Sequence, residues 1–337
     1  MKNEFKIDIK HPRLNNEFFG FKKIDKYFLD VLKKEKISNA YLFYGIKGLG
    51  KATFAYKLSK CILKNSNNLK SISSLNILNN EKINIHVNNL SHPDLTVIET
   101  NEENKKINFD SLKSLDKITY GTSSESKYKI IIIDSLDEFS SKKSFSSLLK
   151  LLEDCPKNCI FFLISHSLNK VPNTIKSRCQ KIYFNQLSNE LLKKWFQNSK
   201  LVDEKDINIL INLANGSLGK ALQVINNENF FNIYKEGEKI INNMANINKD
   251  EINNFFSLFD KNLEVDDFLK VIQIIIIQNI KNSFNENKNM DKKSVNAYIS
   301  LFFEINKKLD KFKSFDLHDA QILETIKFIF IKHSENF

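Results

Sequence analysis

The stretch AYLFYGIKGLGKATFA, residues 40–55, decides the fold that we expect for this chain. Its first five residues form an apolar, aromatic run typical of a buried strand, and three glycines follow within six positions. The whole chain has only 8 glycines, so their clustering here is a positional signal. Backbone N–H groups of such a turn surround a phosphate, which the following lysine neutralises. The stretch therefore predicts a strand, a phosphate-binding loop and a helix.

The loop departs from the pattern of an active nucleotide hydrolase. Its candidate nucleotide-binding residues are Gly45, Gly48, Gly50, Lys51, Ala52 and Thr53. Active phosphate loops place Ser or Thr directly after the lysine, where the hydroxyl binds Mg²⁺, and Ala52 stands there instead. A loop that binds phosphate without hydrolysis and a glycine-rich start of a helix both fit these residues.

Composition favours a soluble globular chain of two or three domains, because 337 residues with 42% hydrophobic residues can bury a sizeable core. The net charge of +11 suits a partner with phosphates, although lysines spread along the whole chain explain it equally well. No apolar segment follows Met1, and no CxxC pair occurs among Cys61, Cys155, Cys159 and Cys179, so we expect a cytoplasmic protein. The apolar run VIQIIIIQNI, from Val271, is too short to cross a bilayer.

Strand-like and helix-like segments alternate in the first half of the chain. Further strand candidates are DLTVIE (94–99), KIIIID (129–134) and CIFFLIS (159–165). A helical pattern over 52–63 and another around Leu148 separate these strands, which predicts the α/β class, with a parallel sheet covered on both faces. The Asn- and Ser-rich segment 64–91 is expected to be a loop-like insertion.

Apolar residues at helical spacing mark the remaining helices. One set comprises Phe145, Leu148, Leu149 and Leu152, preceded by serines that are available as N-caps. The pattern is helical throughout from about residue 187. Two broad stripes near the end comprise Phe268, Val271, Ile272 and Ile275, and Ile322, Leu323, Ile326, Ile329 and Phe330. Stripes of this width need partners within the domain or in another chain.

Two further motifs carry candidate chemistry. In IIIIDSLDE, Asp134 ends a buried strand, where phosphate-loop NTPases hold Mg²⁺ through water, although it could also cap the next segment. Ser135 follows where an acid would polarise the attacking water, and the nearby acids Asp137 and Glu138 are displaced along the chain. In VPNTIKSRCQ a short helix is expected after Pro172, and Arg178 closes it before a strand. A lone arginine of this kind is most often a solvated surface residue.

The order of motifs resembles the delta-prime subunits of the bacterial DNA polymerase III clamp loader, which are AAA+ proteins. The motifs are GxxGxGK, HPD, IIIID, LLKLLEDCP, PNTIKSRC and GSLGKAL; Pro93, Pro156 and Pro172 fall on them, and Pro12, the fourth proline, falls on the N-terminal motif HPRLNNEFFGF. The likeness begins at HPRLNNEFFGF (11–21) and continues to about residue 225. The loop with Ala before Thr is similar to alphaproteobacterial forms.

The resemblance implies an organisation and partners. Residues 1–186 would form an AAA+ RecA-like α/β domain, residues 187–245 a helical lid, and residues 246–337 a helical collar for oligomerisation. Arg178 would be an arginine finger acting in trans, and Ser165 and Lys220 would lie in the sensor regions. The implied partners are gamma/tau and delta subunits, the sliding clamp and, through the complex, primer–template DNA. Weak binding of ATP or ADP is also implied.

Three departures from the motor subunits of the family favour a non-hydrolysing stator, a component of the DNA-directed DNA polymerase (nucleotidyltransferase) holoenzyme without turnover of its own. Ala52 and Ser135 replace the hydroxyl and the acid, and Gly219 stands where motor subunits have a sensor arginine. Only Cys61 remains in the interval that holds a zinc module in many relatives, so no zinc is expected. The alternatives are a gamma/tau-type motor ATPase and a monomeric DNA-binding protein with a relic loop.

Overall fold

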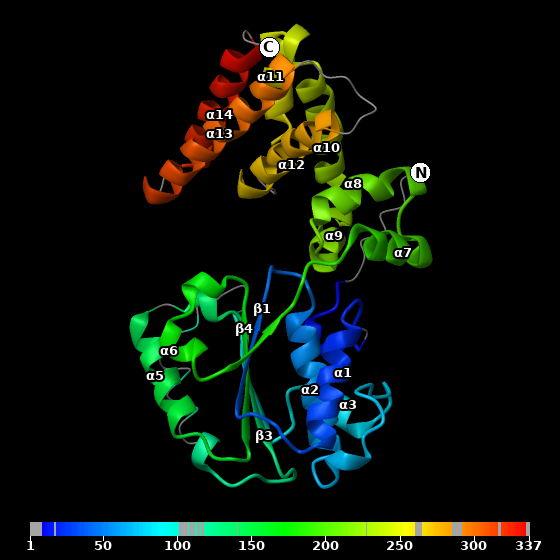
Figure 1. Cartoon of the computed structure of the whole chain (residues 1–337), viewed down its shortest axis with the longest axis vertical. Coiled ribbons are helices and arrows are strands. Elements are labelled where there is room, and N and C mark those ends of the chain that lie inside the picture. The colour runs from blue at the N-terminus through cyan, green and yellow to red at the C-terminus, as the bar shows by residue number, and fades with distance from the viewer. Residues whose placement is uncertain are drawn as a thin grey trace. The chain divides into compact units, whose positions relative to one another are not determined.

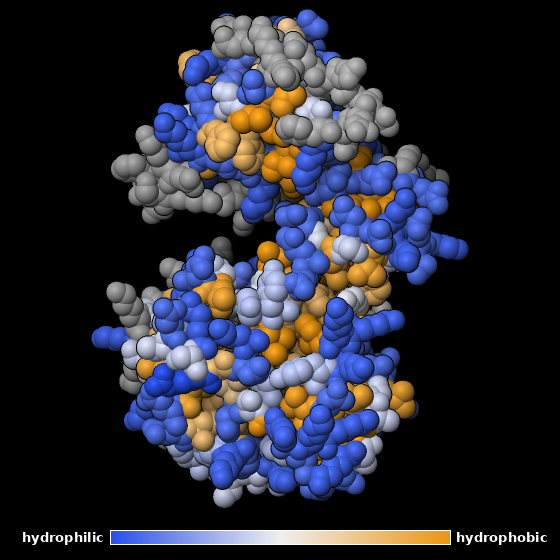
Figure 2. All heavy atoms as spheres, viewed as in Figure 1, coloured by the Kyte–Doolittle hydropathy of each residue, from blue (hydrophilic) through white to orange (hydrophobic). Residues whose placement is uncertain are grey.

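The computed structural model describes residues 9–16, 18–100, 107, 112, 115, 118–139, 141–226, 228–259, 265–284, 292–315 and 318–334. The chain divides into two compact units (Figure 1). One unit contains residues 8–198 together with 215–220, and the other contains 199–214 and 221–337, with the N-terminal residues 1–7. In Figure 2 hydrophilic residues cover much of the visible face of each unit, with hydrophobic patches between them.

The first unit is built on a parallel sheet of five described strands, in the order β2-β3-β4-β1-β5. The strands are β1 (Ala40–Tyr44), β2 (Leu95–Ile98), β3 (Lys129–Ile133), β4 (Cys159–Ser165) and β5 (Gln180–Tyr183). Every residue of β3 and β4 is buried, which explains their unbroken apolar sequences. The predicted α/β class with a parallel sheet is confirmed.

Helices cover both faces of this sheet (Figure 1). On one side lie α1 (Lys22–Lys33), α2 (Lys51–Lys64) and α3 (Lys82–Asn88), and on the other lie α5 (Lys142–Glu153) and α6 (Asn173–Lys176). The α5 side has an aliphatic core, in which Leu148 and Leu151 pack with Ile131 and Leu163. The α2 side is aromatic, and its buried rings include Phe28, Phe43, Phe54, Phe162 and Phe184. Helix α7 (Asn189–Ser199) follows β5.

Two local expectations are corrected. The Asn- and Ser-rich segment 64–91 is not entirely a loop, because it contains α3 and a 3-10 turn at Leu69–Ser71. Helix α3 packs on α2 and buries Val87 completely, which offsets the weak helix propensity of its asparagines. Ser141 is the N-cap residue of α5, yet its side chain makes no capping bond and instead lies 3.3 Å from the Ser144 hydroxyl.

The second unit is helical throughout its described residues. Its helices are α8 (Glu204–Ala214), α10 (Glu228–Asn242), α11 (Lys249–Ser257), α12 (Val265–Phe284), α13 (Lys292–Phe315) and α14 (Asp319–Ser334), and α9 (Leu218–Ile225) leads into it from the first unit. Much of the predicted stripes is buried here, including Phe268, Ile272, Ile326 and Phe330. The apolar stripes therefore find partners within the unit itself. The division into lid and collar stays a prediction.

Over the described residues, no helix is both long enough and apolar enough to cross a membrane.

Candidate functional site

The predicted phosphate loop joins β1 to α2, as the sequence indicated. Gly48 and Gly50 both have φ of +83°, a left-handed conformation that costs a residue with a Cβ atom free energy. Gly50 is also the N-cap residue of α2, so the positive end of a 14-residue helix faces the loop. The backbone thus has the form that holds a phosphate.

Lys51 is turned onto its own loop. Its side chain is buried, with 2% of the residue exposed, and Nζ donates hydrogen bonds to the carbonyls of Gly45 at 2.6 Å and Ile46 at 2.7 Å. Burial lowers the pKa of this amine to about 8, although the nearby Asp134 and Asp137 oppose that effect. These bonds take two of the three N–H donors of the ammonium group, which leaves one for a phosphate.

The position after the lysine offers little to Mg²⁺. Ala52 is the second residue of α2 and has no hydroxyl. Thr53 carries the next hydroxyl, but this residue is buried with 8% of its surface exposed. The missing hydroxyl at residue 52 is therefore not supplied by an exposed neighbour on the same helix turn.

Asp134 lies at the carboxyl end of β3, close to Lys51. Its backbone N–H donates to the Ile98 carbonyl at 2.8 Å, and its carboxylate accepts the Ser135 hydroxyl at 3.4 Å. Burial raises the pKa of this carboxyl to about 6, with the charge of Lys51 opposing the shift. The N-cap of the next turn is Ser135, so the alternative capping role of Asp134 is not seen.

Ser135 and His166 form a neutral pair where a motor subunit has its catalytic acid. Ser135 is buried with φ of +69°, and its Oγ lies 3.2 Å from Nε2 of His166. The backbone N–H of His166 donates to Asp137 at 2.8 Å, which holds the pair in place. Burial and the charge of Lys51 lower the pKa of His166 to about 4, so the imidazole is uncharged at neutral pH. Ser135 and His166 are 31 positions apart, so no local motif predicted this contact.

The sensor regions also meet the loop. Ser165 ends β4 opposite Tyr44 of β1 and is completely buried, and its Oγ accepts from the Ser167 N–H at 3.2 Å. The backbone N–H of Lys220 donates to the hydroxyl of Ser217 at 3.2 Å. Both predicted sensor residues are thus placed by backbone and hydroxyl contacts beside the phosphate loop.

A close backbone approach joins residues 217–220 to the loop. The Gly219 N–H donates to the Gly48 carbonyl at 2.9 Å, and the Ser217 hydroxyl donates to the Lys47 carbonyl at 2.8 Å. A Cβ atom added to Gly219 would lie 2.8 Å from Cα of Gly48, closer than real Cβ atoms come. A side chain at residue 219, including the arginine of motor subunits, therefore does not fit this arrangement.

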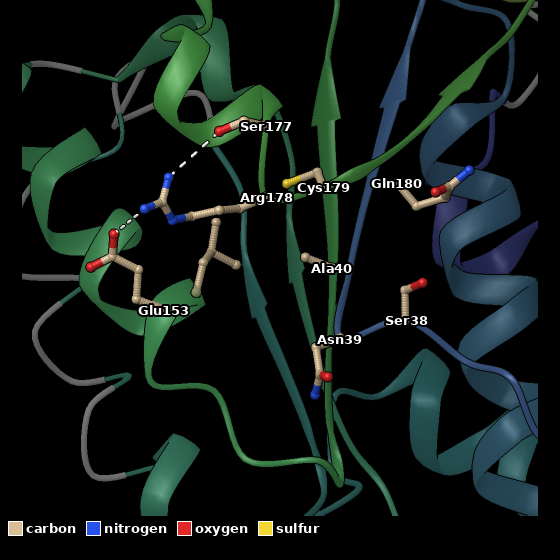
Figure 3. A pocket seen from close by; sticks show the side chains of 9 residues that line it. Ser38, Asn39, Ala40, Glu153, Ser177, Arg178, Cys179 and Gln180 are labelled. Carbon is tan, nitrogen blue, oxygen red and sulfur yellow. Dashed lines mark hydrogen bonds and ion pairs between the residues drawn. The ribbon is translucent and has the colours of Figure 1, made fainter.

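Arg178 lies in a separate open cavity of about 700 Å³, between the end of α6 and the start of β5 (Figure 3). Its Nη1 donates to the Thr174 carbonyl at 3.1 Å and to the Ser177 hydroxyl at 3.5 Å, and its Nη2 forms an ion pair with Glu153. The side chains of Arg178 and Glu153 are 38% and 45% exposed. The other lining residues are Ser38, Asn39, Ala40, Leu152, Ser177, Cys179 and Gln180. Glu153 belongs to the motif LLKLLEDCP, and its contact with Arg178 was not predicted from the sequence.

Arg178 and the phosphate loop lie at opposite edges of the sheet. Strands β1 and β5 are parallel neighbours, with Tyr41 opposite Gln180 and Tyr44 opposite Tyr183. Arg178 precedes β5 at the amino ends of the strands, whereas the loop follows Tyr44 at the carboxyl ends. A strand rises about 3.3 Å per residue, so the length of β1 separates them by roughly 16 Å. Of the predicted site residues, the structure brings together the loop, Asp134 and the sensor regions, and leaves Arg178 apart.

The N-terminal motif that begins at His11 is tied to this carboxyl edge. Glu99, directly after β2, lies 3.4 Å from His11 Nε2 and 3.3 Å from Arg13 Nη1, and it accepts the Tyr56 hydroxyl at 3.1 Å. Because Glu99 also raises the pKa of Asp134, the cluster adds negative charge beside the position where Mg²⁺ would be held.

The parallel sheet in the order β2-β3-β4-β1-β5, the glycine loop on a helix N-terminus and the aspartate at the end of β3 define a P-loop α/β protein of the AAA+ class. Residues 21–188, about half of the chain, match the family model described as DNA polymerase III, delta subunit. The chain belongs to the family of DNA polymerase III clamp-loader subunits.

The chain is similar both to gamma/tau subunits and to delta' subunits of DNA polymerase III. The DNA polymerase III subunit gamma/tau of Mycoplasma genitalium is 26% identical over 79% of this chain, and the subunit delta' of Bacillus subtilis is 27% identical over 62% of it. The aligned regions span 42% and 60% of those relatives, respectively. A crystal structure of a gamma subunit-related protein of Thermotoga maritima covers 91% of this chain and 99% of its own, at 14% identity and a TM-score of 0.40.

Proposed function

We propose that this chain is a delta-prime-type stator of the clamp loader, which turns over no ATP itself and supplies Arg178 to the nucleotide site of a neighbouring subunit. One observation carries the proposal: Arg178 lies at the amino edge of the sheet, on the side opposite to the chain's own phosphate loop. An arginine side chain cannot span that separation. A phosphate bound by Arg178 would therefore belong to another chain.

The geometry of the chain's own loop supports the absence of turnover. Ala52 offers no Mg²⁺ hydroxyl, Ser135 is hydrogen-bonded to a neutral His166 in place of an acid, and the close approach of Gly219 leaves no room for a sensor arginine. In motor subunits of the family, the hydroxyl, the acid and the sensor arginine each act on phosphoryl transfer. Their combined replacement favours a site without catalytic function.

The same loop retains groups that fit a nucleotide. The phosphates of ATP or ADP would be held by the backbone of Gly48 and Gly50 and by the amine of Lys51. The bound nucleotide would contribute only its charge and its contacts with the loop. Binding is expected to be weak, because the Gly45 and Ile46 carbonyls already take two of the three N–H donors of Lys51. We propose no zinc site for this chain.

The helical unit is the part that we assign to assembly with gamma/tau and delta subunits. Phe303 on α13 and Phe328 on α14 are each 66% exposed, which is unusual for rings of this size. We assign these rings to contacts with the other subunits. The assembled complex would open the sliding clamp and load it onto primer–template DNA.

A gamma/tau-type motor is the second candidate, because one relative at 26% identity carries that name. ATP turnover by the purified chain separates the two functions. We expect negligible turnover with and without DNA, whereas a rate of about 1 per second or more, ordinary for an enzyme, would establish the motor. Weak nucleotide binding without turnover agrees with the stator.

A further inference from the structure

Arg178 and Glu153 are presented to each other by rigid elements. Glu153 is the last residue of α5, which is anchored in the core by the fully buried Leu148 and Leu151. Arg178 follows α6, whose Ile175 is also fully buried. Figure 3 shows the guanidinium turned toward the Glu153 carboxylate. The pairing therefore follows from the packing of the two helices.

Composition gives Arg178 unusual weight. The chain has 51 basic residues, and all of them are lysines except Arg13 and Arg178. Both arginines contact a carboxylate, Glu99 for Arg13 and Glu153 for Arg178. A chain that uses lysine almost everywhere else has arginine where a planar fork of donors is used, and lysine cannot provide such a fork.

The present contacts occupy the fork. Nη1 donates to the Thr174 carbonyl and Nη2 is paired with Glu153, so both outer nitrogens of the guanidinium already have partners in the same chain. A phosphate that binds the fork through two parallel N–H bonds must use at least one of these nitrogens. Glu153 is therefore a competitor of any phosphate that approaches Arg178.

We propose that Glu153 holds Arg178 in a parked position in the isolated chain, with Nη2 on its carboxylate, and yields the arginine to the phosphates of a neighbouring subunit's nucleotide. The inference rests on the proposed function. Glu153 is a positioning residue, since it acts through Arg178 and does not touch the nucleotide.

The half-exposed ion pair is suited to exchange. With side chains 38% and 45% exposed, such a pair changes an equilibrium by about fivefold at most. A nucleotide phosphate has more negative charge than one carboxylate and binds the fork through two oxygens, so it displaces Glu153. The carboxylate then remains nearby and opposes the incoming phosphate, which raises the ATP concentration needed for half-maximal turnover.

The parked position is tested first on the isolated full-length chain. Labelling with ¹⁵N-arginine gives side-chain signals from only Arg13 and Arg178. We expect slowed guanidinium rotation at Arg178, faster rotation in Glu153→Gln, and no change in Asp154→Asn, which removes the neighbouring exposed carboxylate. Equal rotation in wild type and Glu153→Gln would show that no parking occurs.

The consequence is tested in the complex reconstituted with gamma/tau and delta subunits. Glu153→Gln should lower the ATP concentration for half-maximal turnover by about two- to fivefold at unchanged maximal rate, while Asp154→Asn leaves both unchanged. The effect should vanish in the Arg178→Ala background. The proposal would be overturned if Glu153→Gln lowered the maximal rate while Glu153→Asp kept it at the wild-type value. It would also be overturned if Glu153→Gln had no effect. A silent Arg178→Ala would instead overturn the proposed function, whatever the rotation of Arg178 in the isolated chain.

Discussion

The two edges of the sheet differ in how their charged groups are partnered. At the carboxyl edge, Lys51 is 2% exposed and bonded to its own loop, and residues 217–220 contact that loop at Lys47 and Gly48. At the amino edge, the side chain of Arg178 is 38% exposed in an open cavity, paired only through contacts that a phosphate can displace. One fold thus contains a loop turned inward and an arginine available to a neighbour. This difference supports the proposal that the chain acts through its amino edge.

The largest effect is expected from a substitution of Arg178 at the amino edge of the sheet. Arg178→Ala should reduce the DNA- and clamp-stimulated ATPase at the site that Arg178 completes by about 10³ or more, because the charge on the transferring phosphoryl group loses its stabilisation. Arg178→Lys should not restore the rate fully, since lysine has no planar fork. The measurement is turnover and clamp loading by the reconstituted complex, with assembly verified by size.

The matched change at the carboxyl edge is Lys51→Ala, which should alter the same ATPase much less. Equal effects of the two substitutions would remove the distinction between the edges.

A smaller effect is expected where the loop is covered. Gly219→Ala should lower the free energy of unfolding by about 1–3 kcal/mol, because the added Cβ meets Gly48 Cα at 2.8 Å and the backbone has to move. Denaturant unfolding of the isolated chain measures this change. Unchanged stability would show that residues 217–220 do not press on the loop, and the argument against a sensor arginine at residue 219 would fail.

The last expected effect concerns Asp134 and pH. The pKa of this carboxyl is about 6 in the folded chain and 3.8 in the unfolded chain, so stability is lost as the pH rises from about 4 to 6. Asp134→Asn should therefore raise the free energy of unfolding by up to about 3 kcal/mol at pH 7, with little gain at pH 4.

The control for this measurement is Asp154→Asn, which removes an exposed carboxylate. If wild type and Asp134→Asn lost stability equally between pH 4 and pH 6.5, then ionisation of Asp134 would not be what destabilises the folded chain.

Much of the fold followed from local pattern. The strands at 40–44 and 159–165 have the predicted bounds because their residues are apolar throughout, as burial on both faces of a parallel sheet requires. The short helix after Pro172 and the strand after Arg178 also occur as expected. Helix α3 was not predicted, because asparagines interrupt the apolar pattern of its sequence. Its apolar face is stabilised by contact with α2, which the local sequence does not indicate.

The candidate site was predicted unevenly for the same reason. The loop residues and Asp134 belong to contiguous motifs, so the sequence alone locates them. Glu153 and Arg178 are 25 positions apart, and His166 and Ser135 are 31 apart, so neither pair has a local signature. Arg178 itself was located by the motif PNTIKSRC, and Arg13 is the one other arginine in the chain.

The sequence by itself determined the parallel α/β class, the phosphate loop and the loss of its hydroxyl and acid, because residue type and strand–turn–helix order act over a few neighbouring positions. The tertiary structure alone decided that the loop is covered by Gly219, that Arg178 meets Glu153, and that the two sites lie at opposite edges. These facts depend on the strand order β2-β3-β4-β1-β5, which brings distant segments together. Burial of both sheet faces selects that order, and no single segment encodes it.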